Sequence, residues 1–332
     1  MISPRLSIVI ALAATLAAAC TTEESSTPAP TLTSTTSTTT TTTTTTVAPT
    51  TTSAPTTVEE TTTTPAPTTT LPSGPADVRV PLLIGGQGGG WLYLGAWEFD
   101  RWAAAFDDDG NPITPSIGPG TAVTVTNLGL DSPATLGQFT EACFDEREGP
   151  TLDVEVAAPE PPGFGYGAVA LPTPAWTLSP RQIAVTETGP PAYQAIGEAA
   201  FAGDPVDASL GAVVQVVVAD LDGDGDDEAI AVFEHVAADT ISGAPGDLAA
   251  VLLIETATRE SSTPLKAFVD QDLDPAAFPV TIRYRVVDVA DYNGDGRMEV
   301  AVHSWYYEGS SLIVFEYDGT ELVEVLVAGC GS

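Results

Sequence analysis

Two short acidic segments constrain this chain more than any other feature of its sequence. Residues 220–228 read DLDGDGDDE, and residues 291–299 read DYNGDGRME. Carboxylates spaced this closely repel one another, so each segment must either face water or surround a cation. Glycine at the sixth position, Gly225 or Gly296, permits the sharp backbone turn that a cation-binding loop needs. The sequence therefore predicts two metal loops of the same construction.

Oxygen atoms at alternating positions of each segment are the expected ligands. The first, third and fifth side chains can point to one centre, the seventh residue offers its backbone carbonyl, and the ninth supplies a closing carboxylate. Six to eight oxygens at about 2.3–2.6 Å suit calcium better than magnesium, which demands stricter geometry. We expect two structural calcium ions, with these ligands: Asp220, Asp222, Asp224, Asp226 (backbone) and Glu228, then Asp291, Asn293, Asp295, Arg297 (backbone) and Glu299. A metal-free Asp-Gly turn is the alternative for either loop.

The segments on both sides of each loop are predicted strands, which argues against an EF-hand. An EF-hand needs flanking helices and a bidentate Glu at position 12, where this chain has Ala231 and Val302. The flanks are instead rich in β-branched residues. The predicted strands are residues 212–219, 229–235, 283–290 and 299–307.

This strand, loop, strand unit resembles the FG-GAP/VCBS repeats of bacterial surface proteins and integrin propellers. In those repeats an Asp-x-Asp-x-Asp-Gly-x-x-Asp/Glu loop binds calcium between two strands. The resemblance covers residues 212–237 and 283–307, and extends through 312–329, which would supply the third and fourth strands of a blade. It implies a mainly β fold of short antiparallel strands in partial, β-propeller-like blades, because a closed propeller typically needs 4–8 blades.

The remaining folded part is also predicted to be mainly β. Asp-Gly pairs at 105–113 and 315–322 predict hairpins, and one short helix is expected near 190–203, where Gly203 would end it. We place an N-terminal β unit at 76–187 and a C-terminal calcium-binding β unit at 188–332. The strands predicted in the first unit are residues 78–84, 121–128, 151–156 and 181–187.

An aromatic stretch at residues 91–102 stands out in the N-terminal unit. In regular strand geometry one face would carry Trp91, Tyr93, Trp97 and Phe99. A buried β face and an exposed strip for stacking on sugar rings are both compatible with this spacing.

The N-terminus predicts export to the cell surface. Residues 1–20 carry an early arginine, an apolar run and a terminal cysteine, as in a signal peptide. The ending LAAAC resembles the lipobox of bacterial lipoproteins, which implies lipidation of Cys20; an ordinary cleaved signal is the alternative. Residues 21–75 are rich in Thr and Pro and predict a disordered tether. The protein is therefore expected on the outer face of the bacterial cell membrane or at the cell surface.

An exported chain folds where disulfides persist. We expect a bridge between Cys143 and Cys330, with two separate thiols as the alternative.

Charge and side-chain chemistry limit the possible functions. With 45 Asp and Glu against 10 Lys and Arg, the net charge of −35 repels nucleic acid and anionic lipid headgroups. Membrane contact is thus expected through the lipid anchor only. The sequence has no Gly-x-Ser-x-Gly motif, and its two histidines, His235 and His303, do not form a zinc-type pair. These features favour a binding or adhesion module without catalysis, whose ligand would be a carbohydrate or a protein. The alternative is a secreted polysaccharide hydrolase with its site near residues 91–102.

Overall fold

The computed structural model describes residues 80–85, 91–107, 113, 117–140, 151–156, 167–237, 243–274 and 277–331. The signal peptide, Cys20, the tether, Cys143, the side chain of Cys330 and residues 108–112 of the first Asp-Gly hairpin lie outside the described residues. The lipidation, tether and disulfide predictions are therefore not addressed by the fold.

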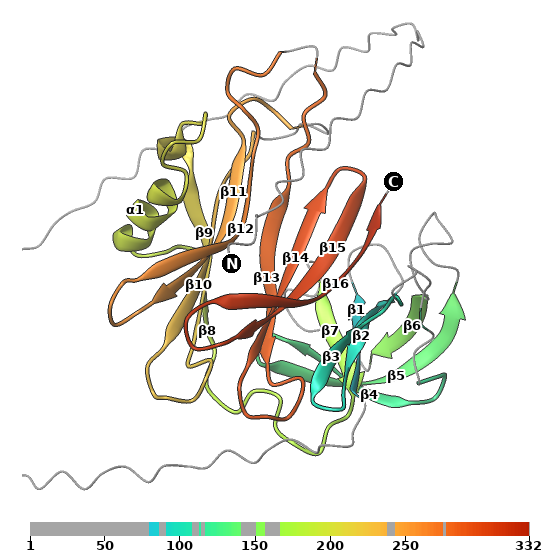
Figure 1. Ribbon diagram of the computed structural model, residues 1–332. Helices are drawn as coiled ribbons and strands as arrows, with labels where there is room; N and C mark the ends of the chain where they lie inside the picture. Colours follow the sequence, from blue (N-terminus) through green and yellow to red (C-terminus); the bar gives the residue numbers. More distant parts are fainter. Residues whose placement is uncertain are drawn as a thin grey trace, which may run out of the picture. The chain divides into compact units, whose positions relative to one another are not determined.

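The fold is mainly β, as predicted, with strands in antiparallel sheets (Figure 1). A seven-stranded sheet has the order β1-β7-β4-β5-β6-β2-β3, and a further pairing joins β2 back to β1. Its strands are β1 (Val80–Gly85), β2 (Trp91–Glu98), β3 (Arg101–Ala104), β4 (Ala122–Asn127), β5 (Leu130–Thr140), β6 (Thr151–Val156) and β7 (Ala168–Pro172).

The C-terminal half forms a five-stranded sheet, β12-β11-β10-β9-β8, and a four-stranded sheet, β13-β14-β15-β16. Their strands are β8 (Ala184–Thr186), β9 (Ala212–Ala219), β10 (Glu228–His235), β11 (Leu248–Glu255), β12 (Ser261–Phe268), β13 (Arg283–Ala290), β14 (Glu299–Tyr306), β15 (Gly309–Tyr317) and β16 (Leu322–Gly331).

The two C-terminal sheets repeat one pattern. In each, four strands that follow one another along the chain are antiparallel neighbours, and an acidic segment joins the first strand to the second. The strand-loop-strand arrangement expected around both segments is confirmed. The Asp318-Gly319 hairpin between β15 and β16 is confirmed as well. Strand β8 lies in the expected N-terminal unit (76–187), and it pairs with β9 of the expected C-terminal unit (188–332).

The four-stranded sheet is apolar on both faces because each face packs against a different sheet. Along β14, Val300 and Val302 join a core shared with the five-stranded sheet. Ala301 between them joins a core shared with Leu82 and Leu94 of the seven-stranded sheet. This double burial explains why residues 300–302 of β14 are apolar at three successive positions.

Helix α1 (Pro191–Ala200) covers the other face of the five-stranded sheet (Figure 1). Pro191 stands in its first turn, where a proline is favoured because its ring fixes φ near the helical value. The helix ends at Ala200, before the Gly203 that the sequence suggested as its stop. Among the described residues no helix has the length and apolar character needed to cross a membrane.

A fully buried carboxylate connects the seven-stranded and four-stranded sheets. Asp288 of β13 accepts hydrogen bonds from the Leu128 backbone N–H (2.6 Å) and the Tyr292 hydroxyl (3.0 Å). Burial raises the pKa of Asp288 to about 6, although these hydrogen bonds oppose the increase. The two sheets therefore share a polar link as well as an apolar core.

The aromatic residues of β2 do not share one face, contrary to expectation. Trp91 and Tyr93 are buried in the core of the seven-stranded sheet, whereas Trp97 packs towards the four-stranded sheet. A register shift opposite Leu82 and Leu83 interrupts the alternation, and Gly95 there has a φ of 143°. Phe99 lies in the β2–β3 turn and is 71% exposed.

We predict that Gly197→Ala destabilises the protein, although alanine is the better helix former. Helix propensity alone would stabilise the variant by about 1 kcal/mol. A Cβ at Gly197 would collide with the Phe233 ring, however, and overpacking of this kind costs about 1–3 kcal/mol. Urea unfolding of the full-length chain would measure the net loss. Adding Phe233→Leu should recover part of it, and a Gly197→Ala variant more stable than the parent would contradict the packing.

Candidate metal centre

The two acidic loops have the same backbone hydrogen-bond network. In the first, the Asp220 carboxylate accepts from the N–H groups of Gly223 (2.6 Å) and Gly225 (3.2 Å). In the second, the Asp291 carboxylate accepts from the N–H groups of the corresponding glycines at 2.6 and 3.0 Å. The first aspartate of each loop therefore fixes the turn itself.

Each loop needs two glycines, of which only the one at position six was predicted from the sequence. Gly223 and Gly225 have φ angles of 83° and 97°, and Gly294 and Gly296 have 78° and 87°. Residues with a Cβ rarely adopt these left-handed conformations. The spacing Gly-x-Gly within both segments was the signal that could have revealed the second position.

Further side-chain contacts repeat from loop to loop. The third residue accepts from the N–H of the fifth, and the fifth from that of the seventh, in both loops. The closing carboxylates follow the same rule: Glu228 accepts from Leu221 N–H at 2.8 Å, and Glu299 accepts from Tyr292 N–H at 2.7 Å. The two loops are thus structural repeats.

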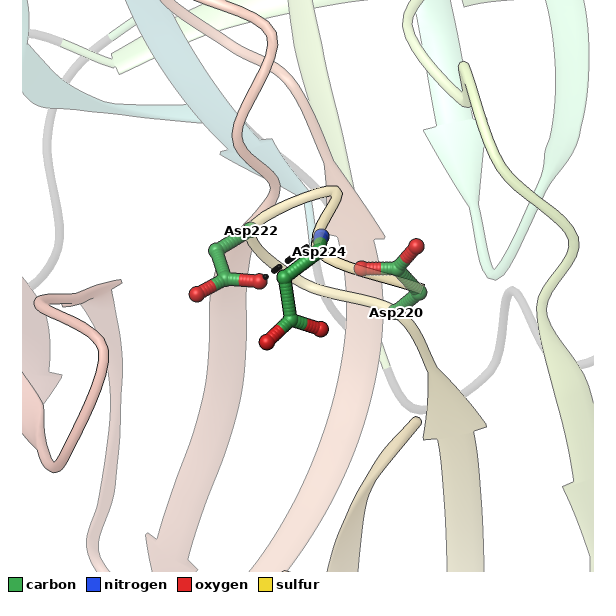
Figure 2. A group of neighbouring side chains, drawn as sticks. All are labelled: Asp220, Asp222 and Asp224. Atoms are coloured by element: carbon green, nitrogen blue, oxygen red, sulfur yellow. Dashed lines mark hydrogen bonds between the residues drawn. The ribbon is translucent and has the colours of Figure 1, made fainter. Parts of the chain in front are cut away.

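The first loop brings three of its predicted ligands together. Asp220, Asp222 and Asp224 each offer an oxygen, and these atoms lie within 4.8 Å of one another (Figure 2). Two oxygens on opposite sides of one calcium ion would be about 4.8 Å apart at ordinary ligand distances. The spacing therefore fits a single ion. The side chains of Asp226 and Glu228 are not part of this group.

The second loop gathers a different set of carboxylates. Asp295, Glu299 and Glu316 offer oxygens within 4.8 Å of one another. Asp291 and Asn293 are buried and accept hydrogen bonds from loop N–H groups. Glu316, which lies on β15, was not among the ligands predicted from the sequence. The available signal was an acidic residue inside the apolar run of 312–317.

Glu299 carries the least compensated charge of the two loops. Its side chain is 0% exposed, one oxygen accepts from Tyr292 N–H, and the other, Oε1, has no hydrogen-bond partner. Burial, followed by the charges of Asp295 and Asp291, raises its pKa well above the usual value. A buried carboxylate oxygen without a partner is costly, and a bound cation would offset that cost.

Other carboxylates of the loops also have raised pKa values. Burial raises the pKa of Glu228 to about 7, and nearby Glu255 and Asp222 add to the effect. Burial raises the pKa of Asp291 to about 6, against the hydrogen bonds from Gly294 and Gly296. Without a cation, therefore, these groups keep their protons to a higher pH than ordinary carboxylates do.

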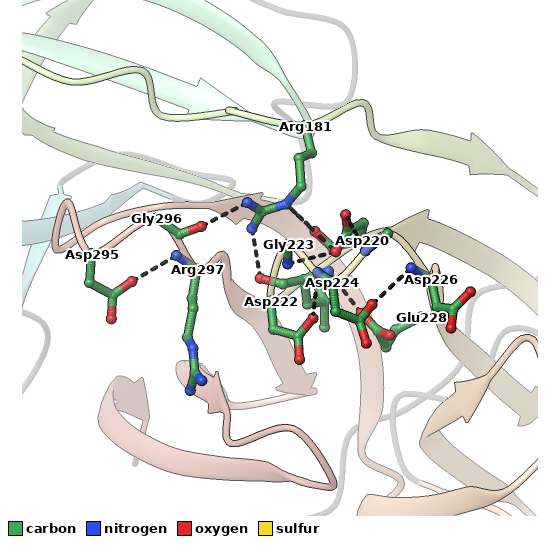
Figure 3. Close-up of polar contacts among 12 residues, drawn as sticks. Arg181, Asp220, Asp222, Gly223, Asp224, Asp226, Glu228, Asp295, Gly296 and Arg297 are labelled. Atoms are coloured by element: carbon green, nitrogen blue, oxygen red, sulfur yellow. Dashed lines mark hydrogen bonds and ion pairs between the residues drawn. The ribbon is translucent and has the colours of Figure 1, made fainter. Parts of the chain in front are cut away.

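Arg181 joins the two loops (Figure 3). Its guanidinium donates to the Leu221 carbonyl of the first loop (2.8 Å) and to the Gly296 carbonyl of the second (2.7 Å), and also to the Asp220 carbonyl. Met298 N–H donates to the same Leu221 carbonyl at 2.8 Å. The sequence pattern placed Arg181 in a predicted strand, so this role was not predicted.

Trp176 covers the second loop from the side. Its indole N–H donates to the Asp291 carbonyl at 2.8 Å, and its ring lies against Gly294. This contact and the Arg181 contacts both come from the connection between β7 and β8.

Comparison of the chain with protein-family models, with curated proteins and with solved structures found no match in any of the three. The chemistry of the loops is therefore inferred from their own residues.

The two histidines have other contacts or positions than the carboxylate groups. His303 of β14 stacks on Trp305 with ring centroids 5.1 Å apart, and His235 ends β10. Neither belongs to a described cluster of metal-binding side chains.

We predict that the chelator-treated protein loses stability as the pH rises from about 4 to 7. The pKa values of Asp291 and Glu228 are about 6 and 7 in the fold, above the ordinary values of 3.8 and 4.5. In this window the folded state binds more protons than the unfolded state, so raising the pH favours unfolding. Thermal unfolding with chelator, followed by circular dichroism at several pH values, would test this.

The matched variant for this measurement is Glu228→Gln, which removes one of these titrations. It should have a flatter pH profile than the parent chain. A chelated parent that becomes more stable between pH 5 and 7 would show that the carboxylates are not protonated in the fold.

Proposed function

We propose that this protein is a calcium-binding surface protein in which the ions are structural and the role is binding or adhesion without catalysis. The observation that carries the calcium proposal is Glu299, a fully buried carboxylate whose Oε1 has no partner and which lies beside Asp295 and Glu316. The identical hydrogen-bond network of the two loops extends the proposal to the first loop.

Calcium is the cation that this chemistry favours. The side chains gathered in both loops offer only oxygen ligands, which hard cations prefer, and no cysteine or histidine belongs to the described groups. Calcium also tolerates irregular coordination by several carboxylates, whereas magnesium keeps more of its water.

The strand order supports a blade-like role for each loop. Strands β9–β12 and β13–β16 are four-stranded antiparallel units with the loop between the first and second strands. This order agrees with the resemblance to FG-GAP/VCBS repeats, and we propose that the two units are partial propeller-like blades. In each, the ion would offset clustered charge and fix two strand ends.

A ligand surface is proposed beside the four-stranded sheet. Phe278 is 63% exposed and its ring contacts that of Tyr307, which is also exposed, with centroids 5.3 Å apart. Exposed rings of this kind suit stacking on a carbohydrate or contact with a protein. Trp91 and Tyr93 are buried, so they are not available for stacking on a polysaccharide.

We predict that millimolar calcium raises the melting temperature of the full-length chain by several degrees. A ligand that binds only the folded state at 100 times its dissociation constant adds about 2.7 kcal/mol of stability. Asp222→Ala and Asp295→Ala should each reduce the rise, because each removes a gathered oxygen. Differential scanning calorimetry would measure it.

Two controls make this measurement specific. Magnesium at the same concentration should stabilise much less. Asp272→Ala, which removes an exposed carboxylate outside both loops, should respond to calcium as the parent does. A parent chain that calcium does not stabilise would refute the proposed role of the ions.

Attachment to the membrane is a separate part of the proposal and rests on the sequence of residues 1–75. Cys20→Ala should release the protein from the membrane fraction of the expressing cells, since the lipid would be its anchor. Membrane fractionation with immunoblotting would show this. A Cys20→Ala variant that stays in the membrane fraction would exclude lipidation as the anchor.

A further inference from the structure

The second loop has fewer acidic residues than the first, yet its surroundings are more buried. It carries Asn293 where the first loop has Asp222, and Arg297 where the first has Asp226. On sequence alone, the first loop would therefore be expected to bind calcium more tightly, because ligand charge tunes affinity.

An additional carboxylate lies near each loop. It comes from the third strand along the chain in each four-stranded unit, β11 in β9–β12 and β15 in β13–β16. In the five-stranded sheet, Glu228 pairs with Glu255 of β11 across the strands. In the four-stranded sheet, Val300 pairs with Phe315, so Glu316 of β15 is next in register to Glu299. Like charges directly opposite each other on neighbouring strands are destabilising unless something compensates them.

The two additional carboxylates are in different situations. Glu255 accepts a hydrogen bond from the Tyr317 hydroxyl at 2.6 Å and does not belong to the first carboxylate group. Glu316 belongs to the second group, within 4.8 Å of the oxygens of Asp295 and Glu299. Burial and the charge of Asp295 raise the pKa of Glu316. The charge of Arg297 lowers that pKa, and this is the smallest of the effects on it.

We infer that Glu316 is a direct ligand of the second calcium ion, and that Tyr317 withholds the corresponding Glu255 from the first. This inference rests on the proposed calcium binding. Glu316 replaces the charge that Asn293 lacks and lies beside buried Glu299, whose Oε1 has no hydrogen-bond partner. The second site is therefore the tighter one, while the first, formed by more exposed side chains, exchanges its ion more readily.

Adjacent residues of one strand thus set the properties of both sites. Successive side chains of a strand point to opposite faces, so Glu316 faces the second loop while Tyr317 faces the five-stranded sheet. The sequence Glu-Tyr at 316–317 makes the two sites unequal.

The test is calcium titration of the full-length chain by calorimetry. The Asp222→Ala variant serves as the background, because only the second site is then intact. In this background Glu316→Gln should weaken calcium binding at least about tenfold, as expected for loss of a charged ligand. The matched control, Glu255→Gln, should change it less than about twofold. In an Asp295→Ala background, Tyr317→Phe should strengthen binding at the first site by freeing Glu255.

Terbium luminescence excited through tryptophan gives a second readout of the same site. Trp176 lies against the second loop and Trp102 lies near Glu316. Terbium, used as a calcium substitute, should therefore be sensitised at the second site. Glu316→Gln should shift this titration to higher terbium concentrations, whereas Glu255→Gln should not.

The stability of the chelated variants separates a ligand from a purely structural residue. Glu316→Gln removes a like-charge contact, so the chelated variant should melt at a higher temperature than the chelated parent while binding calcium more weakly. If Glu316 served only as a structural hydrogen-bonding group, the chelated variant would melt lower. A parent that binds no calcium would refute the proposed function. A parent that binds two ions, together with unchanged affinity in Glu316→Gln, would overturn only the role of Glu316.

Discussion

Electrostatic repulsion between carboxylates held close together is the constraint on which the C-terminal half of this protein depends. Glu228 faces Glu255 and Glu299 lies beside Glu316, in strands whose apolar residues fix the register. The sheets cannot relieve this repulsion by slipping, because a shift of one residue would turn their buried side chains towards the wrong face. Protonation or a bound cation is the remaining way to compensate it, and at neutral pH a cation is the more effective.

Much of the fold could be predicted because local patterns agree with the tertiary structure. The apolar run 212–219 is β9, as predicted. The Asp-Gly pair at 318–319 forms the predicted hairpin, which joins β15 to β16. The aromatic face of β2 was predicted wrongly, because a bulge depends on the partner strand and leaves little trace in the sequence. Gly95 was the only local indication of it.

The candidate site could be predicted only within each loop. Position, spacing and glycine content identify Asp220, Asp222 and Asp224 as neighbours without any tertiary information. Glu316 and Arg181 reach the loops from other strands and connections, so their contribution depends on how the sheets pack. Spacing along the sequence predicts contacts within one loop. It does not predict contacts with residues far along the chain.

The bridge made by Arg181 has a consequence for the order of folding. It joins residues 115 positions apart, and the Leu128–Asp288 contact joins residues 160 apart. Contacts this distant in sequence form late and slowly. The two loops can therefore reach their final arrangement only after most of the chain has collapsed. Calcium would then act mainly by slowing unfolding rather than by accelerating folding, a distinction that stopped-flow kinetics would resolve. In that case bound ions would set how long a folded molecule lasts before it first opens, not how quickly it forms.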